Sequence, residues 1–100
     1  MDMEQTIFEM IAHAGNAKSY CFEALNFAKN KNFKKSEDLM EKAKKELLLS
    51  HNVQTNLIHE ESSGVKHEVS ILLVHAQDTL MDAILAKDLI TEFIDLYKNK

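Results

Sequence analysis

The chain has 100 residues, a formal net charge of −4, no proline and only two glycines. This length fits one domain spanning residues 1–100, and the scarcity of helix-breaking residues favours long helices over sheets with tight turns. Because the chain is acidic and no lysine cluster alternates with aromatic side chains, nucleic acid is excluded as a partner.

The sequence also argues against a membrane or secreted protein. Its longest nearly apolar run, residues 71–85, is interrupted by His75, Gln77, Asp78 and Asp82 and falls short of the roughly 20 residues that a helical span needs. The N-terminus carries Asp2 and Glu4 in place of the basic start of a signal peptide. Cys21 has no cysteine to pair with, which fits a reducing compartment and a small core residue. These features predict a cytoplasmic protein with no direct membrane insertion.

The first predicted helix spans about residues 3–30. Asp2 is a good N-cap for it, and the turn residues Asn30, Lys31 and Asn32 end it. Apolar residues recur along it at helical spacing, namely Ile7, Met10, Ile11, Ala14, Ala17, Cys21, Leu25 and Ala28.

The second predicted helix spans about residues 33–62, with Asn32 as its N-cap and Gly64 suited to the left-handed position beyond its C-terminus. Its apolar stripe comprises Leu39, Met40, Ala43, Leu47, Leu57 and Ile58, and lysine and glutamate residues cover the other side. The link to the first helix is short, so the two helices should be antiparallel neighbours.

The third predicted helix spans about residues 68–98, and its start is placed between Lys66 and Ser70. In its first half apolar residues surround the axis, whereas the second half has one charged side. A single three-helix chain covers only one face of each helix, so an apolar surface on every side implies contact with other subunits. The fold class is therefore all-α, and we expect an oligomer centred on this helix.

Three polar residues share one side of that apolar segment. On a helix advancing about 100° per residue, His75, Asp78 and Asp82 fall within an arc of roughly 60°. An unpaired carboxylate costs several kcal/mol to bury, so this stripe calls for a structural or chemical reason.

The other candidate residues have simpler interpretations. No histidine belongs to a His-Glu-x-x-His or Glu-x-x-His motif, which argues against zinc and di-iron sites. His51 lies on the apolar face of the second helix beside Gln54, which favours a core histidine satisfied by hydrogen bonds. Lys18 lies on the apolar face of the first helix, which favours a lysine that reaches solvent at the rim of the core.

His75 is the best candidate for chemistry. A neutral imidazole is a good nucleophile near neutral pH, and if an acceptor holds one ring nitrogen, the other can take a phosphoryl group. The chain has no glycine-rich phosphate loop, so the phosphoryl donor would be another protein and not a bound nucleotide. The alternative is a structural helical adaptor in which His75 and Asp78 form a buried polar pair that sets oligomer register.

Three motifs together resemble a known family. They are His75-Ala76-Gln77-Asp78 with Leu80-Met81, the run 14–19 (Ala-Gly-Asn-Ala-Lys-Ser), and His51-x-x-Gln54-Thr55. Over essentially the whole chain, the sequence resembles the lactose/cellobiose-type enzyme IIA of the bacterial phosphoenolpyruvate-dependent sugar phosphotransferase system.

The resemblance implies an up-down-up antiparallel three-helix bundle that assembles into a homotrimer. It implies that the histidine-containing phosphocarrier protein phosphorylates His75, and that the phosphoryl group then passes to a cysteine of enzyme IIB and on to a lactose-, cellobiose- or chitobiose-type sugar carried by the membrane component IIC. Asp78 would lie near the trimer axis, where three copies share a divalent cation such as Mg²⁺. A hard cation with oxygen ligands would remove the repulsion between the three carboxylates.

Two positions depart from the family pattern. Thr79 stands where many members carry a second histidine, and Asp82 stands where a neutral residue is more usual. The resemblance assigns no role to Asp82, which either orients His75 or reaches solvent. Gln77 is either a neighbour of the site or a helix-packing residue.

Overall fold

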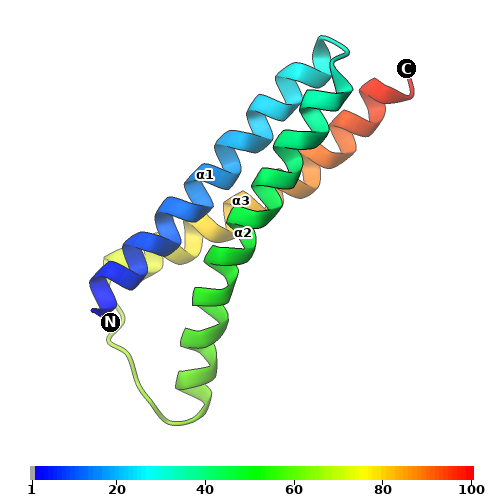
Figure 1. Ribbon diagram of the computed structural model, residues 1–100. Helices are drawn as coiled ribbons and strands as arrows, with labels where there is room; N and C mark the ends of the chain where they lie inside the picture. Colours follow the sequence, from blue (N-terminus) through cyan, green and yellow to red (C-terminus); the bar gives the residue numbers. More distant parts are fainter. Residues whose placement is uncertain (1) are drawn as a thin grey trace.

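The computed structural model describes residues 2–100 and consists of three helices in chain order. α1 spans Met3–Lys29, α2 spans Phe33–Ser62 and α3 spans Ile71–Lys98. The bundle is elongated, about 51 × 20 × 20 Å. Figure 1 shows α1 and α2 side by side and antiparallel, with α3 behind them and running in the same direction as α1. The predicted all-α, up-down-up architecture is confirmed, and the described residues contain no strand.

The first two helices begin and end where the sequence predicts. The Asp2 carboxylate accepts a hydrogen bond from the Glu4 backbone N–H, and the Asn32 side chain accepts one from the Lys35 N–H. Between the helices, Lys31 adopts a left-handed φ of 64°, which reverses the chain within the predicted turn. Gly64 has a φ of 97° just beyond α2, as expected of a glycine at that position.

The predicted start of the third helix at residue 68 is wrong by three residues. Ser70 is extended, and its hydroxyl oxygen accepts a hydrogen bond from the Leu73 backbone N–H at 3.1 Å, so the helix begins at Ile71. The side-chain cap decides the boundary because it satisfies an N–H that has no partner within the first turn. Consequently His75 lies in the second turn of α3 and not in its third.

Small residues dominate the core. Seven buried alanines line the contacts between the helices, four of them on α1, and the largest fully buried side chains include Met10 and Leu80. One core cluster joins Met10, Ala14 and Ala17 of α1 to Leu80 and Ala83 of α3. α3 therefore packs mainly on α1, and it diverges from α2 at the lower end of the bundle (Figure 1).

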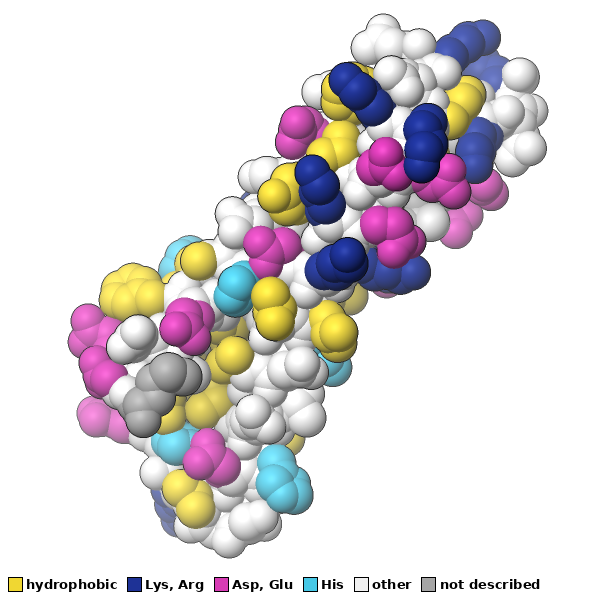
Figure 2. All heavy atoms as spheres, in the orientation of Figure 1, with side chains coloured by type: hydrophobic (Ala, Val, Ile, Leu, Met, Phe, Trp, Pro, Cys, Tyr) yellow, Lys and Arg dark blue, Asp and Glu magenta, His cyan; other side chains and the backbone are white. Residues whose placement is uncertain are grey.

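None of the three helices combines the length and hydropathy of a membrane span, within residues 2–100. Charged side chains gather over the upper end of the face in Figure 2, whereas hydrophobic and histidine side chains are more frequent over its lower half. The two ends of the bundle thus present chemically different surfaces.

Cys21 is the small core residue that the sequence predicts. It is fully buried beside Ala43 and Ile90. Burial raises the pKa of the Cys21 thiol to about 11, against the smaller opposite effect of the Lys87 ammonium. The thiol is therefore protonated at neutral pH and is a poor nucleophile.

We expect Leu80→Ala to destabilise the protein by about 2–5 kcal/mol, because it removes a fully buried side chain and leaves a cavity between α1 and α3. Leu49→Ala is the matched control, because Leu49 is 48% exposed on α2, and it should change the stability by less than about 1 kcal/mol. Urea denaturation of both variants measures the difference. Equal losses for the two would contradict the assigned core.

We also expect Cys21 to resist alkylation. At pH 8, iodoacetamide should modify the native protein at least about 100-fold more slowly than the same chain in denaturant, because the native thiol is both buried and protonated. The rate is followed by intact mass over time. A native rate close to the denatured rate would show that Cys21 is not part of a stable core.

Candidate functional site

An apolar stripe along α3 is not covered by the other two helices. Val74, Met81, Leu85 and Leu89 are each about half exposed, between 48% and 59%. Their helical positions lie opposite the buried residues of α3, which are Ala76, Leu80, Ala83 and Ile90. The helix is therefore apolar on two sides, and only one of them meets the chain's own core.

His75 lies beside this stripe and its side chain is exposed. Within residues 2–100, its ring nitrogens make no hydrogen bond, and its backbone carbonyl accepts one from the Thr79 hydroxyl at 2.7 Å. Two other histidines are engaged: His13 Nδ1 lies 2.6 Å from a Glu46 oxygen, and His67 Nε2 lies 3.2 Å from a Glu60 oxygen. The imidazole of His75 is therefore open to a reaction partner on both nitrogens.

Asp78 and Asp82 follow His75 on the same side of α3, one turn apart. Both are exposed in the single chain, and no ion pair among the described residues involves either carboxylate. The prediction of a buried polar stripe therefore does not hold for the chain by itself, because no helix of the same chain covers it. The adaptor alternative also loses its basis within one chain, since no hydrogen bond joins His75 to Asp78 in residues 2–100.

Gln77 is held from the opposite side. Gln54 Nε2 of α2 donates a hydrogen bond to Gln77 Oε1 of α3 at 2.6 Å and lies 3.9 Å from the Met81 sulfur. Gln54 and Gln77 are both partly buried. The contact orients Gln77 and leaves its amide nitrogen without a hydrogen bond in the described chain. Gln54 is on the predicted His51-x-x-Gln54-Thr55 motif, but the sequence does not indicate this partner.

Two further predictions have different outcomes. His51 was expected in the core, but it is exposed and its ring makes no hydrogen bond within residues 2–100. The buried residues of α2 near this level are Leu47, Ser50 and Leu57, and His51 lies at the edge of that side of the helix, where its ring faces solvent. Lys18 is exposed, as expected of a lysine at the rim of the core.

A polar network joins α1 and α2, and the sequence does not indicate it. One oxygen of Glu46 faces His13 Nδ1, and the other accepts a hydrogen bond from Asn16 Nδ2 at 3.1 Å. The Glu46 side chain is only 20% exposed, so both of its oxygens are engaged where water is partly excluded. His13 and Asn16 lie three residues apart on α1, which is the one sequence signal that could have paired them with a common acceptor.

Metal ligands do not converge within one chain. Among residues 2–100, no group of three or more histidine, cysteine, aspartate or glutamate side chains is arranged to hold a metal ion. Asp78 is nevertheless a suitable single ligand, because its carboxylate is exposed, is not paired with a cation and offers the oxygen atoms that Mg²⁺ prefers. A site built on Asp78 would need carboxylates from further copies of the chain.

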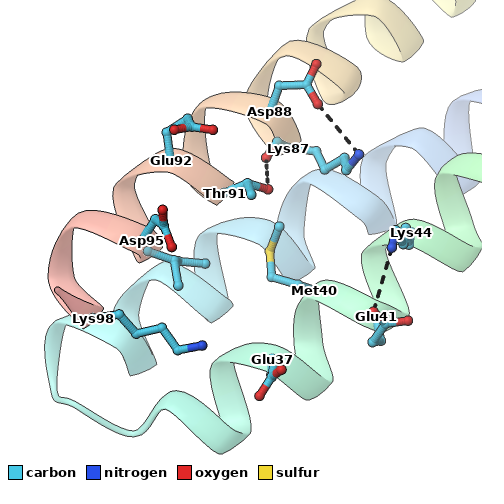
Figure 3. A pocket seen from close by; sticks show the side chains of 11 residues that line it. Glu37, Met40, Glu41, Lys44, Lys87, Asp88, Thr91, Glu92, Asp95 and Lys98 are labelled. Atoms are coloured by element: carbon cyan, nitrogen blue, oxygen red, sulfur yellow. Dashed lines mark hydrogen bonds and ion pairs between the residues drawn. The ribbon is translucent and has the colours of Figure 1, made fainter.

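A groove of about 470 Å³ lies between the C-terminal half of α3 and the N-terminal half of α2 (Figure 3). Its walls carry internal ion pairs, Lys87 with Asp88 at 3.6 Å and Lys44 with Glu41 at 3.8 Å. It begins twelve residues beyond His75 along α3 and does not include that residue. The groove is therefore separate from the site around His75.

Comparison with known proteins assigns a family context to this geometry. The family model described as "PTS system, Lactose/Cellobiose specific IIA subunit" matches residues 5–98. The lichenan-specific phosphotransferase enzyme IIA component of Bacillus subtilis is 42% identical over 97 residues, covering 97% of this chain and 88% of the relative. The N,N'-diacetylchitobiose-specific EIIA component of Escherichia coli K12 is 38% identical, covering 97% of this chain and 84% of the relative.

Solved structures agree with the sequence relatives. The cellobiose-specific enzyme IIA of Bacillus anthracis superposes with a TM-score of 0.94 at 47% identity, over 99% of this chain and 92% of that one. The IIA(Chitobiose) structure from E. coli, solved in complex with HPr, superposes with a TM-score of 0.85 at 36% identity, over 99% of this chain and 96% of that one. Both likenesses extend over all three helices.

Proposed function

The chain belongs to the lactose/cellobiose-specific IIA family, whose members are phosphotransferase components of the sugar phosphotransferase system, and we propose that it carries the phosphoryl group on His75. The observation that carries the proposal is the exposed imidazole of His75 beside an uncovered apolar stripe, with neither ring nitrogen engaged in residues 2–100. No other histidine combines an unengaged ring with a place on this helix.

The phosphoryl donor in this proposal is the histidine-containing phosphocarrier protein. A homologous IIA structure was solved in complex with HPr, which supports a partner of this kind. A nitrogen of neutral His75 attacks the phosphorus in line with the departing donor nitrogen, so that one N–P bond forms as the other breaks. The donor ring takes up a proton from solvent on its other nitrogen and leaves as a neutral imidazole. Phosphorylated His75 keeps the proton on its second nitrogen, and the positive charge on its ring is lost when that proton passes to solvent.

The second transfer in the proposal goes to enzyme IIB. A cysteine thiolate of that partner attacks the same phosphorus, an S–P bond forms, and the N–P bond to His75 breaks. Both partners need to reach the same atom, which an exposed imidazole allows. Apolar residues around His75 would exclude water from either docked complex and so limit hydrolysis of the phosphoryl group. The cytoplasmic location stays a prediction.

We further propose that three copies associate through α3. An apolar stripe that runs the length of a helix marks an association surface, because isolated soluble chains rarely leave so continuous a patch uncovered. Cyclic symmetry brings the same stripe of each copy to a common axis. Asp78 lies in the centre of the stripe, so association brings three carboxylates together.

Asp78 would hold a divalent cation such as Mg²⁺ in this assembly. The ion, when bound, neutralises carboxylates that would otherwise repel one another away from bulk water. Each chain contributes one aspartate, which accords with the lack of a complete metal site within residues 2–100 of one chain. The metal in this proposal has a structural role in assembly and takes no part in phosphoryl transfer.

The phosphocarrier proposal is tested by incubating the protein with phosphoenolpyruvate, enzyme I and the phosphocarrier protein. We expect a mass gain of one phosphoryl group that is labile in acid, as a phosphorus–nitrogen bond is. His75→Ala should abolish the gain, while His51→Ala should keep it, because His51 is also exposed but lies on α2. A wild-type protein that gains no mass, or a His75→Ala variant that still does, would refute the assignment.

The axial cation is tested with Asp78→Leu. We expect the wild type to bind one Mg²⁺ per three chains and this variant to bind none, while its helices and its association persist because leucine also removes the repulsion. Isothermal titration with Mg²⁺ measures binding, and sedimentation measures association. Asp38→Leu, which alters an exposed aspartate on α2, serves as control and should bind normally. Stoichiometric binding by Asp78→Leu would rule out Asp78 as the ligand.

A further inference from the structure

Asp82 lies on the proposed association surface of α3, and its carboxylate has no partner within residues 2–100. It follows Asp78 by one turn and is exposed beside Met81 and Leu85, which are 53% and 59% exposed. No ion pair or hydrogen bond within residues 2–100 involves its carboxylate. If α3 packs on other copies, this carboxylate loses part of its hydration and needs a donor from a neighbour.

The pattern of α3 defines where that donor must come from. In the heptad description, Asp78 and Leu85 occupy a positions and Val74 and Met81 occupy d positions, which form the apolar seam. The flanking e positions hold His75, Asp82 and Leu89, and the flanking g positions hold Gln77 and Ile84. Ala76 and Ala83 occupy f positions, opposite the seam, and both are fully buried against the chain's own core.

In parallel helices a g residue of one copy faces the e residue about five positions later in the next copy. Gln77 then faces Asp82, and Ile84 faces Leu89. The two residues of each pair have the same polarity: Gln77 and Asp82 are both polar, and Ile84 and Leu89 are both apolar. In a three-fold cyclic assembly, the α3 helices that run along the axis are all parallel. The parallel arrangement that the symmetry requires is therefore also the one in which these pairs match.

The Gln77 amide is already oriented for the role. Gln54 donates to its oxygen at 2.6 Å, which holds the amide in one orientation and leaves its Nε2 hydrogens without an acceptor within the described chain. An amide N–H is a suitable donor to a carboxylate, and such charge-assisted hydrogen bonds are stronger than neutral ones.

From these observations we propose that Asp82 of each copy accepts a hydrogen bond from Gln77 of the neighbouring copy, with Gln54 as the residue that positions Gln77. The inference rests on the association through α3 proposed above and deepens it. It gives Asp82 a partner, and it fixes the parallel register of the helices that carry His75.

The test is a charge cycle on the association constant, measured by sedimentation equilibrium at pH 7.5 with helicity checked by circular dichroism. Gln77→Glu places two carboxylates against each other and should weaken association at least about tenfold. Adding Asp82→Asn should restore association to within about threefold of the Asp82→Asn protein, because each repelling pair then becomes a carboxylate facing an amide. Added salt should reduce the effect of Gln77→Glu.

Asp38→Asn is the matched control for the rescue. It removes the same charge, but Asp38 lies on α2, is exposed and is already 3.1 Å from Lys34 of its own chain, so it lies outside the α3 surface. Gln77→Glu with Asp38→Asn should therefore stay weak. Equal rescue by both asparagine variants, or none by Asp82→Asn, overturns the pair while the association stands. A wild type that remains monomeric overturns the association and the pair together, whereas phosphorylation of His75 is measured independently.

Discussion

The structure depends on how one helix with two apolar sides is covered. The buried side of α3 packs on α1 through small residues, with Ala76 and Ala83 fully buried and Leu80 filling the space between them. Alanine contacts let two helix axes approach closely and leave little room for the side chains to shift. Within residues 2–100, neither α1 nor α2 covers the other side of α3, so its apolar residues are exposed from Ile71 to Leu96. The placement of His75, Asp78 and Asp82 follows from this arrangement, because all three lie on the uncovered side.

The residues on the two sides of α3 are under different physical constraints. The α1 contact holds the backbone of α3 in place, and the Ser70 cap sets its first turn, so the position of His75 is determined by groups that take no part in chemistry. The uncovered side can accept polar residues only where a partner copy, a cation or solvent compensates for their burial. An exposed histidine at the edge of the stripe satisfies both constraints: its backbone is fixed by the core, and its ring remains accessible to other proteins.

Much of this arrangement could be predicted from the sequence, and the failures have specific causes. The first two helices follow from local signals, since Asp2, Asn32 and Gly64 act within a few residues of where they stand. The start of α3 was placed early because Lys66 to Val69 carry no strong breaker, and only the Ser70 hydrogen bond decides the boundary. His51 was misplaced because its exposure depends on which side of α2 the other two helices cover, which is a tertiary property. The Gln54–Gln77 and His13–Glu46 contacts join residues 23 and 33 positions apart, and no local pattern specifies such pairs.

If His75 carries the phosphoryl group, as proposed, the acidic residues beside it also affect the direction of transfer. Asp78 and Asp82 follow it by three and seven residues, which places them about 5 and 11 Å along the helix axis. These separations are comparable with the screening length of about 8 Å at physiological salt, so a phosphoryl group with nearly two negative charges would feel both carboxylates. A cation at Asp78 would cancel the nearer charge. The Gln77 amide that we propose as the partner of Asp82 is neutral. It contributes a hydrogen bond but no counter-charge, so the full negative charge of Asp82 remains. Asp82 would thus raise the free energy of phosphorylated His75 relative to a chain with a neutral residue there, and so favour passing the group onward.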